Sequence, residues 1–132
     1  MRQESSYEGF IESSAGARGL MQIIPSTGAQ LATDLQWPEN YTVEDLDRPY
    51  VSLVFGANYL RRQRGLFEGD TFAMLAAYNG GPGNTLAWKD LASGDDPDLF
   101  LEVIRIEETR NYIRLINEIH SVYKWLYGEL TE

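Results

Sequence analysis

An apolar segment that ends in a glycine- and proline-rich run constrains the fold of this chain most firmly. Residues 71–79 read TFAMLAAYN and follow Asp70, a residue type that often accepts backbone hydrogen bonds at a helix start. The run NGGPGN at residues 79–84 ends such a helix abruptly, because glycine adopts left-handed conformations and proline has no N–H to donate. The sequence therefore predicts a short buried helix with a sharp stop.

Two further helices are predicted before this one. Pro25, followed by STGAQLATDL, is typical of a helix with proline in its first turn. After the polar connection 35–46, we expect Asp47 to act as the N-cap of a helix with Pro49 just inside, ending at Gly65. Spacing by three and four predicts that its buried face consists of Tyr50, Leu53, Val54, Ala57 and Leu60.

The remaining helices follow the glycine-rich run. Asn84 is expected to cap a short helix that runs through Trp88 and closes at Gly94, and GDDPD is expected to form a turn. Residues 99–104, LFLEVI, predict a brief apolar segment. The longest helix is predicted from Glu108 to Tyr127, with a stop at Gly128. Its inward stripe is expected to contain Ile113, Ile116, Ile119, Tyr123 and Leu126.

These segments predict an all-α domain of six or seven helices with no convincing strand pair, and short helices joined by long polar loops favour a groove. The 132 residues fit one domain, residues 1–132. Lys and Arg total 11 against 20 Asp and Glu, a net charge of -9, and the densest basic cluster is Arg61, Arg62 and Arg64. This balance disfavours nucleic acid and anionic membrane surfaces as partners, but is compatible with a neutral sugar polymer.

Several other classes of site and segment are disfavoured. The chain has no cysteine, which removes disulfides and thiolate zinc sites. It has one histidine, His120, in the predicted last helix, and neither an HExxH motif nor a clustered ligand set, so no metal and no cofactor are expected. No apolar run approaches a membrane span, and no signal peptide is apparent, so any export signal is expected outside this sequence.

Three stretches place polar residues beside small or apolar ones. They are RQESS with Glu4 and Ser5, SSAGARGLMQIIPST, and LAAYNGGPGN. Taken singly, each has an ordinary explanation: a solvated acid, a buried Leu-Met pair beside a surface glutamine, and a helix stop. Tyr112, taken singly, is expected in the core.

Taken in order, these stretches resemble the catalytic domain of the soluble lytic transglycosylases, which has a goose-type lysozyme-like fold. The matching motifs are Glu4-Ser5, AGARGLMQ at 15–22, AYNGGPGN at 77–84 and ETRNY at 108–112. The resemblance covers nearly the whole chain, and it implies cleavage of the β-1,4 bond between N-acetylmuramic acid and N-acetylglucosamine in peptidoglycan. Members of this family add no water and leave a 1,6-anhydro-muramyl end.

The resemblance also assigns roles to residues of this sequence. Glu4 would be the catalytic acid and base, with Ser5 and Ser13 lining the loop beside it. Met21 and Gln22 would contact sugar. The remaining expected substrate-binding residues are Tyr78 and Asn79 on the opposite wall, Tyr112, which would hold Glu4 or the substrate, and Glu108, which is also a candidate helix cap.

A single acid suits this chemistry. Ordinary glycosidases use two carboxylates, whereas a substrate acetamido oxygen can stabilise the anomeric carbon and the C6 hydroxyl can replace water. One carboxyl can then protonate the leaving oxygen and later accept a proton from the C6 hydroxyl. The first step requires Glu4 to retain its proton near neutral pH, which burial against Leu20, Met21 and Tyr78 would favour.

The start of the chain departs from the family pattern. Family members carry an apolar helix before the catalytic glutamate, whereas here only Met1, Arg2 and Gln3 precede Glu4. We therefore expect the first family helix to be largely absent, and the chain to be part of a longer protein that acts in the periplasm or outside the cell. We also expect weaker activity than that of an extended chain, and self-association through the apolar surface left uncovered.

Two other functions remain compatible with the sequence. One is a non-catalytic peptidoglycan-binding module that keeps the groove. The other is a hydrolytic goose-type lysozyme that adds water to the cleaved bond.

Overall fold

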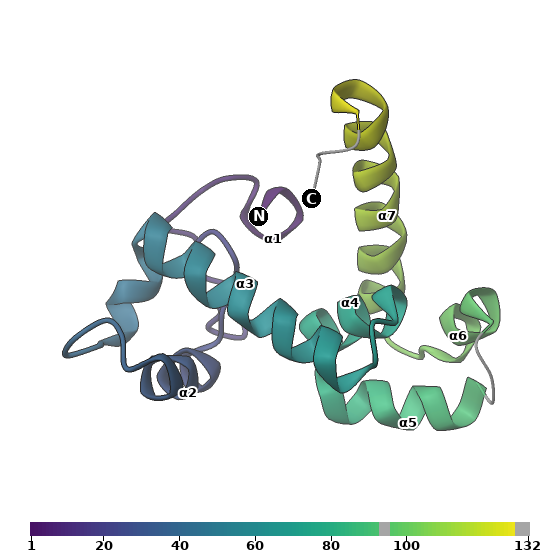
Figure 1. Cartoon of the computed structure of the whole chain (residues 1–132), viewed down its shortest axis with the longest axis horizontal. Coiled ribbons are helices and arrows are strands. Elements are labelled where there is room, and N and C mark those ends of the chain that lie inside the picture. Colours follow the sequence, from purple (N-terminus) through teal and green to yellow (C-terminus); the bar gives the residue numbers. More distant parts are fainter. Residues whose placement is uncertain (93–95, 129–132) are drawn as a thin grey trace. The chain divides into compact units, whose positions relative to one another are not determined.

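A computed structural model describes residues 1–92 and 96–128, and all the regular secondary-structure elements of these residues are helices (Figure 1). Their only extended pairings are two isolated antiparallel bridges, Glu12 with Arg18 and Arg18 with Ile23. The all-α prediction is confirmed. The helices, in chain order, are α1 (Arg2–Ser5), α2 (Pro25–Leu35), the 3-10 helix η1 (Val43–Asp47), α3 (Pro49–Leu66), α4 (Thr71–Gly80), α5 (Pro82–Ala92), α6 (Pro97–Val103) and α7 (Glu107–Tyr127).

The chain divides into two compact units, Met1–Arg62 and Gln63–Glu132, and the boundary lies within α3. Each unit has its own buried apolar side chains. The assignment of residues 1–132 to one transglycosylase domain stays a prediction.

In the Met1–Arg62 unit, α2, η1 and the first turns of α3 enclose a small core. Leu31 and Leu46 are fully buried where α2 approaches η1. Phe55, also fully buried, contacts the ring of Trp37 edge-on at 6.1 Å between centroids and the ring of Tyr41 at 5.7 Å. Edge-to-face and tilted arrangements are those that aromatic pairs prefer, so these rings fix the polar connection between α2 and η1.

The predicted buried face of α3 is wrong. Tyr50 is 71% exposed and Leu53 is 39% exposed, whereas Val51, Ser52 and Phe55 are fully buried. Spacing by three and four from Tyr50 selected one apolar stripe of the helix. The buried face is the neighbouring stripe of Val51, Ser52, Phe55 and Gly56, in which serine and glycine carry no apolar signal. In the structure Ser52 and Gly56 lie inward, because only small side chains allow the loop that carries Gly19 and Met21 to approach the helix closely.

In the Gln63–Glu132 unit, helices α4 to α7 pack around one apolar cluster. Three alanines of α4, Ala73, Ala76 and Ala77, are fully buried and let neighbouring helices approach closely. Trp88 of α5 and Ile113 of α7 fill the space that these small side chains leave. The buried members of the cluster are Phe67, Ala73, Leu75, Ala76, Ala77, Trp88, Ala92, Phe100, Leu101, Ile104, Tyr112 and Ile113.

The inward stripe predicted for α7 is correct only for its first part. Ile113 is buried and Ile116 packs against the cluster, whereas Tyr123 and Leu126 are 37% and 54% exposed. Helix α4 has 10 residues and α7 has 21, so α4 can cover only about half of α7 at 1.5 Å per residue. Periodicity identified the apolar face but could not show how far its partner extends.

The helix starts and stops are mostly as predicted. Helix α2 begins at Pro25, and Asp70 caps α4 by accepting a hydrogen bond from the N–H of Ala73 at 3.0 Å. Helix α4 ends at Gly80, before Gly81 with φ 87°. Residues 99–103 of the brief apolar segment belong to α6, which Asp96 caps, and Ile104 follows the end of this helix. The predicted helix end at Gly94 and the first two residues of the GDDPD turn lie outside the described residues. The turn prediction is wrong for the rest of that run, because Asp96 is the N-cap of α6 and Pro97 and Asp98 lie in its first turn.

Three predicted boundaries are wrong by one to three residues. Asp47 ends η1 instead of capping α3, because its carboxylate pairs with Arg18. Asn84 lies inside α5, which begins at Pro82, and its amide donates to the carbonyl of Gly80 at 2.8 Å. Helix α3 continues past Gly65 to Leu66, and the turn is made by Glu68 and Gly69, both with positive φ.

Candidate functional site

Glu4 lies in α1, a single helical turn that is tied to a distant loop through its neighbour Ser5. Glu4 is half-buried and Ser5 is buried. The Ser5 hydroxyl donates a hydrogen bond to the carbonyl oxygen of Leu20 at 3.1 Å. An isolated turn of four residues is unstable in water, so this bond helps to place Glu4 relative to the 15–22 motif.

The segment between α1 and α2 is closed near its tip by Ser13. The backbone N–H of Ser13 donates to the carbonyl oxygen of Ala17 at 2.9 Å, and its Oγ accepts from the N–H of Ala17 at 3.0 Å. Ser13 therefore shapes the loop through its own hydroxyl, as the Ser and Thr side chains of turns commonly do.

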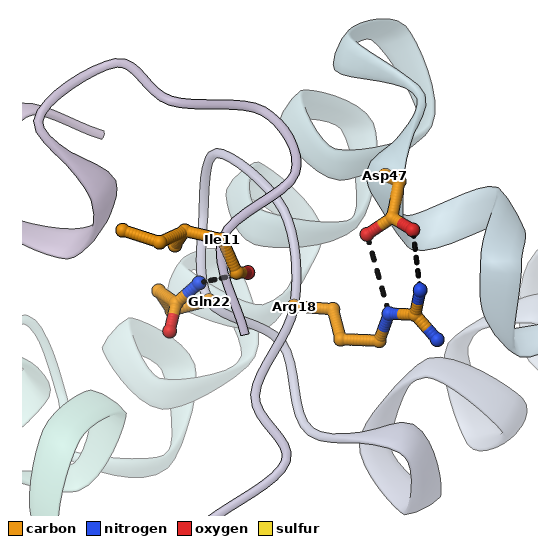
Figure 2. Close-up of polar contacts among 4 residues, drawn as sticks. All are labelled: Ile11, Arg18, Gln22 and Asp47. Atoms are coloured by element: carbon orange, nitrogen blue, oxygen red, sulfur yellow. Dashed lines mark hydrogen bonds and ion pairs between the residues drawn. The ribbon is translucent and has the colours of Figure 1, made fainter. Parts of the chain in front are cut away.

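Gln22 fastens the other end of this segment (Figure 2). Its side-chain amide Nε2 donates to the carbonyl oxygens of Ile11 and Gly19, both at 3.1 Å. Its backbone is left-handed, with φ 47°, an uncommon conformation for a residue with a side chain. Both bonds use the Nε2 group of Gln22. Its amide oxygen takes no part in them and can accept a hydrogen bond from another donor.

An ion pair between Arg18 and Asp47 also holds this segment (Figure 2). Arg18 Nε lies 3.2 Å from Asp47 Oδ1, and Nη2 lies 2.5 Å from Oδ2, a two-point arrangement that fixes the guanidinium plane. The hydrogen bond to Asp47 raises the pKa of Arg18 above its already high ordinary value. The sequence analysis missed this pair, although Arg18 lies within the AGARGLMQ motif.

Met21 is positioned from α3. Its backbone N–H donates to the Oγ of Ser52 at 3.0 Å, and its side chain lies against Gly56. The sequence analysis missed Ser52, since a lone serine inside an apolar helix carries no signal of its own.

In the Gln63–Glu132 unit, the AYN and ETRNY motifs meet. Asn79 Oδ1 accepts a hydrogen bond of 2.7 Å from the hydroxyl of Thr109, which is fully buried. Tyr112 is buried in the apolar cluster, and Tyr78 is half-buried and packs against that cluster. Glu108 is exposed in the first turn of α7, where a carboxylate is favoured by the helix dipole. Thr109 was not predicted, although ETRNY contains it.

The nine predicted site residues therefore form two groups, one in each unit. The first group contains Glu4, Ser5, Ser13, Met21 and Gln22, and the second contains Tyr78, Asn79, Glu108 and Tyr112. Within each group the residues come from motifs distant in sequence, and hydrogen bonds connect those motifs. The roles assigned to the nine residues stay predictions.

Other possible sites were sought in the described part of the chain. It contains no group of three or more His, Asp or Glu side chains placed to hold a metal ion. None of the described helices is long and apolar enough to cross a membrane. A surface hollow of about 420 Å³ lies between the second half of α2 and residues 36–41. Its lining includes none of the predicted site residues, so it is a separate feature.

Known proteins match this chain in sequence and in structure. The transglycosylase SLT domain model matches residues 1–101. The soluble lytic murein transglycosylase of Escherichia coli K12 is 31% identical over 129 residues, covering 97% of this chain and 20% of that protein. A putative soluble lytic murein transglycosylase of Haemophilus influenzae is 36% identical, with 97% and 22% covered.

Solved structures show the same relationship. The 70 kDa soluble lytic transglycosylase of Escherichia coli matches with a TM-score of 0.89 and 31% identity, over 96% of this chain and 21% of that one. An inactive glutamate-to-glutamine mutant of the Pseudomonas aeruginosa transglycosylase Slt matches with a TM-score of 0.84 and 30% identity, again over 96% and 21%. The chain spans about a fifth of the length of these relatives. The lysozyme-like fold prediction is confirmed, and the chain belongs to the transglycosylase SLT family.

Proposed function

We propose that this chain cleaves the β-1,4 bond between N-acetylmuramic acid and N-acetylglucosamine in peptidoglycan without water, leaving a 1,6-anhydro-muramyl end. The observation that carries the proposal is the placement of Glu4. It is a half-buried acid on α1, whose next residue is hydrogen-bonded to the 15–22 motif that also presents Met21 and Gln22. Membership of the transglycosylase SLT family supports the proposal.

Glu4 would act twice in this reaction. In its protonated form it would donate a proton to the leaving glycosidic oxygen as the C1–O bond breaks. As a carboxylate it would then take the proton from the C6 hydroxyl, whose oxygen forms the new bond to C1. The proton that Glu4 gives to the leaving oxygen is replaced by the proton of the C6 hydroxyl. The reaction therefore requires no second acid and no water.

The relatives support both the substrate and the residue type. Two of them are named murein transglycosylases, and a 70 kDa soluble lytic transglycosylase was solved with bulgecin A. The inactive mutant from Pseudomonas aeruginosa replaces a glutamate by glutamine. By analogy with these relatives, the proposed place of action is the cell envelope. Self-association and a stronger activity in a longer chain also stay predictions.

The test is Glu4→Gln, which keeps the shape of the side chain but cannot exchange the proton. Release of soluble muropeptides from purified sacculi should fall by at least about 100-fold. Glu8→Gln is the matched control, since it removes the same charge at an exposed position four residues later. Undiminished release by the Glu4 variant would show that Glu4 is not the catalyst.

Mass spectrometry of the products separates the remaining alternatives. Anhydro ends are lighter than hydrolysed ends by one water, so products carrying that water would identify a hydrolytic lysozyme instead. Binding to sacculi without release of any fragment would identify a non-catalytic binding module.

A further inference from the structure

The buried side of α3 contacts the segment that carries two of the predicted substrate-binding residues. Ser52 and Gly56 are one helical turn apart and therefore share a face. Ser52 is fully buried, and Gly56 is buried beside it. Neither residue belongs to a family motif named above, and no apolar pattern points to either of them.

Ser52 supplies a hydrogen-bond acceptor to the turn at residues 19–22. The backbone N–H of Met21 donates to its Oγ at 3.0 Å. A Cβ placed on Gly19 would lie 2.9 Å from the same oxygen. The hydroxyl therefore lies against both Gly19 and Met21, and removing it would leave the Met21 N–H without this acceptor in a partly buried place.

Gly56 supplies the space for the Met21 side chain. A Cβ at this position would lie 2.6 Å from Met21 Cγ and 2.7 Å from both Cβ and Cε, closer than side chains pack. The methionine therefore occupies the volume that a side chain on residue 56 would fill. Methionine is flexible by itself, so its fixed position comes from the helix and from the Ser52 bond.

The position of Gln22 follows from that of Met21. Gln22 comes next in the chain, its N–H donates to the carbonyl of Gly19 at 3.1 Å, and its Nε2 bonds the same carbonyl. A shift of the turn at Met21 would displace both Gly19 and Gln22 relative to Ile11, whose carbonyl oxygen accepts a hydrogen bond from Gln22 Nε2. Since none of these residues is ionisable, they act by placement rather than by proton transfer.

We propose that Ser52 and Gly56 are positioning residues that hold Met21 and Gln22 in the geometry needed to bind the glycan strand. The proposal rests on the proposed function for its ligand. It assigns to α3 a positioning task in substrate binding that the motifs named above do not contain.

The experiment compares Gly56→Ala and Ser52→Ala with Gly65→Ala. Gly65 is a glycine of the same helix at which a Cβ would meet no atom within 4 Å, so it controls for helix propensity. Affinity for a soluble oligosaccharide of alternating N-acetylglucosamine and N-acetylmuramic acid is measured in the Glu4→Gln background, which removes turnover. We expect the dissociation constant to rise roughly 10-fold in the Ser52 and Gly56 variants and to stay unchanged in the Gly65 variant.

Turnover and spectra add readouts that lost stability alone would not change. With Glu4 intact, KM for the same oligosaccharide should rise with the dissociation constant, while kcat changes by less than about 2-fold. The NMR signals of the Met21 amide and the Gln22 side-chain amide should shift in both test variants. Should Gly56→Ala not fold, Ser52→Ala alone decides, because it removes one oxygen and adds no volume.

Four outcomes are decisive. Parental affinity and KM in a folded Ser52→Ala chain would overturn the proposal, as would an equal loss in Gly65→Ala. A parental chain that binds the oligosaccharide but never cleaves it would overturn the proposed function. The affinities of the variants would then decide this proposal by themselves. A parental chain that neither binds nor cleaves would overturn both.

Discussion

In the Met1–Arg62 unit, the segment between α1 and α2 is held by hydrogen bonds and by close approach of backbone to backbone, whereas in the Gln63–Glu132 unit helices pack around apolar side chains. The first unit, called the loop unit below, uses bonds of Ser5, Ser13 and Gln22 to backbone groups of the segment and a bond of Arg18 to Asp47 of η1. The second, called the packed unit below, uses the alanines of α4 against Trp88 and Ile113.

This difference indicates which unit tolerates which changes. A packed helix surface responds to the volume of its side chains, and can absorb polar changes at its exposed face. A loop held by directed bonds responds to backbone conformation and to individual acceptors. The residues proposed to bind and cleave substrate in the first unit therefore depend on backbone geometry more than on apolar packing.

The largest expected effect is on the loop unit, from Gly19→Ala. Gly19 has φ 76°, and a Cβ there would overlap the carbonyl oxygen of Leu46. Conformational strain and the clash together should lower the free energy of unfolding by about 4 kcal/mol. Urea denaturation followed by tryptophan fluorescence and by circular dichroism measures the loss.

Gly16→Ala separates the strain from the clash. Gly16 has nearly the same φ, 75°, but its Cβ would meet no atom within 4 Å. This variant should lose only about 1–2 kcal/mol, the cost of a left-handed alanine. Equal losses in the two variants would show that the approach to Leu46 contributes nothing, and would weaken the description of this unit as one held by close backbone contact.

The next effect concerns the packed unit, from Ile113→Ala. Ile113 is fully buried in the cluster, so the lost side chain leaves a cavity beside α4. The free energy of unfolding should fall by about 3 kcal/mol. Leu126→Ala on the same helix, where the side chain is 54% exposed, should change it by about 0.5 kcal/mol or less. Similar losses at the two positions would mean that the apolar stripe of α7 contributes to stability along its whole length, as periodicity predicted.

Sequence patterns were sufficient where local chemistry decides the structure. Pro25, Asp70 and the glycines after Asn79 set helix ends through their own backbone properties, and these ends are where they were predicted. The family motifs, taken in order along the chain, also assigned roles to Glu4 and to the other predicted site residues, and those roles stay predictions.

Patterns failed where a contact with a distant segment decides the structure. Asp47 has the chemistry of an N-cap, but Arg18 competes for its carboxylate and wins through a two-point ion pair. Ser52 and Gly56 lack apolar character, yet they lie inward because the loop at Gly19 and Met21 needs small neighbours. Thr109 donates to Asn79 from a motif 30 residues away, and neither residue alone predicts that bond.

The smallest expected effect tests an ion pair of the packed unit, between Asp70 and Lys89. Lys89 Nζ lies 2.8 Å from Asp70 Oδ2, and both side chains are about one-third exposed or less. Burial raises the pKa of the Asp70 carboxyl, but the hydrogen bond and charge of Lys89 and the N–H groups of Ala73 and Phe72 together lower it below its ordinary value of 3.8. A carboxyl with a lower pKa in the folded chain stabilises the fold above the ordinary value. That contribution is lost as the pH falls through the native value.

Asp70→Asn isolates this charge, because asparagine is an equally good helix cap. The variant should be less stable than the parent by about 0.5 kcal/mol at pH 7, since a partly exposed pair contributes little. The gap should narrow as the pH falls below 3.8 and close once Asp70 is protonated in the folded chain. Urea denaturation at several pH values measures it, with Asp90→Asn, an exposed carboxylate on α5 beside Lys89, as the control. A gap that stays constant down to about pH 2 would mean that the cap geometry, not the charge, stabilises α4; the packed unit would then rely, as the loop unit does, on directed hydrogen bonds at its edges.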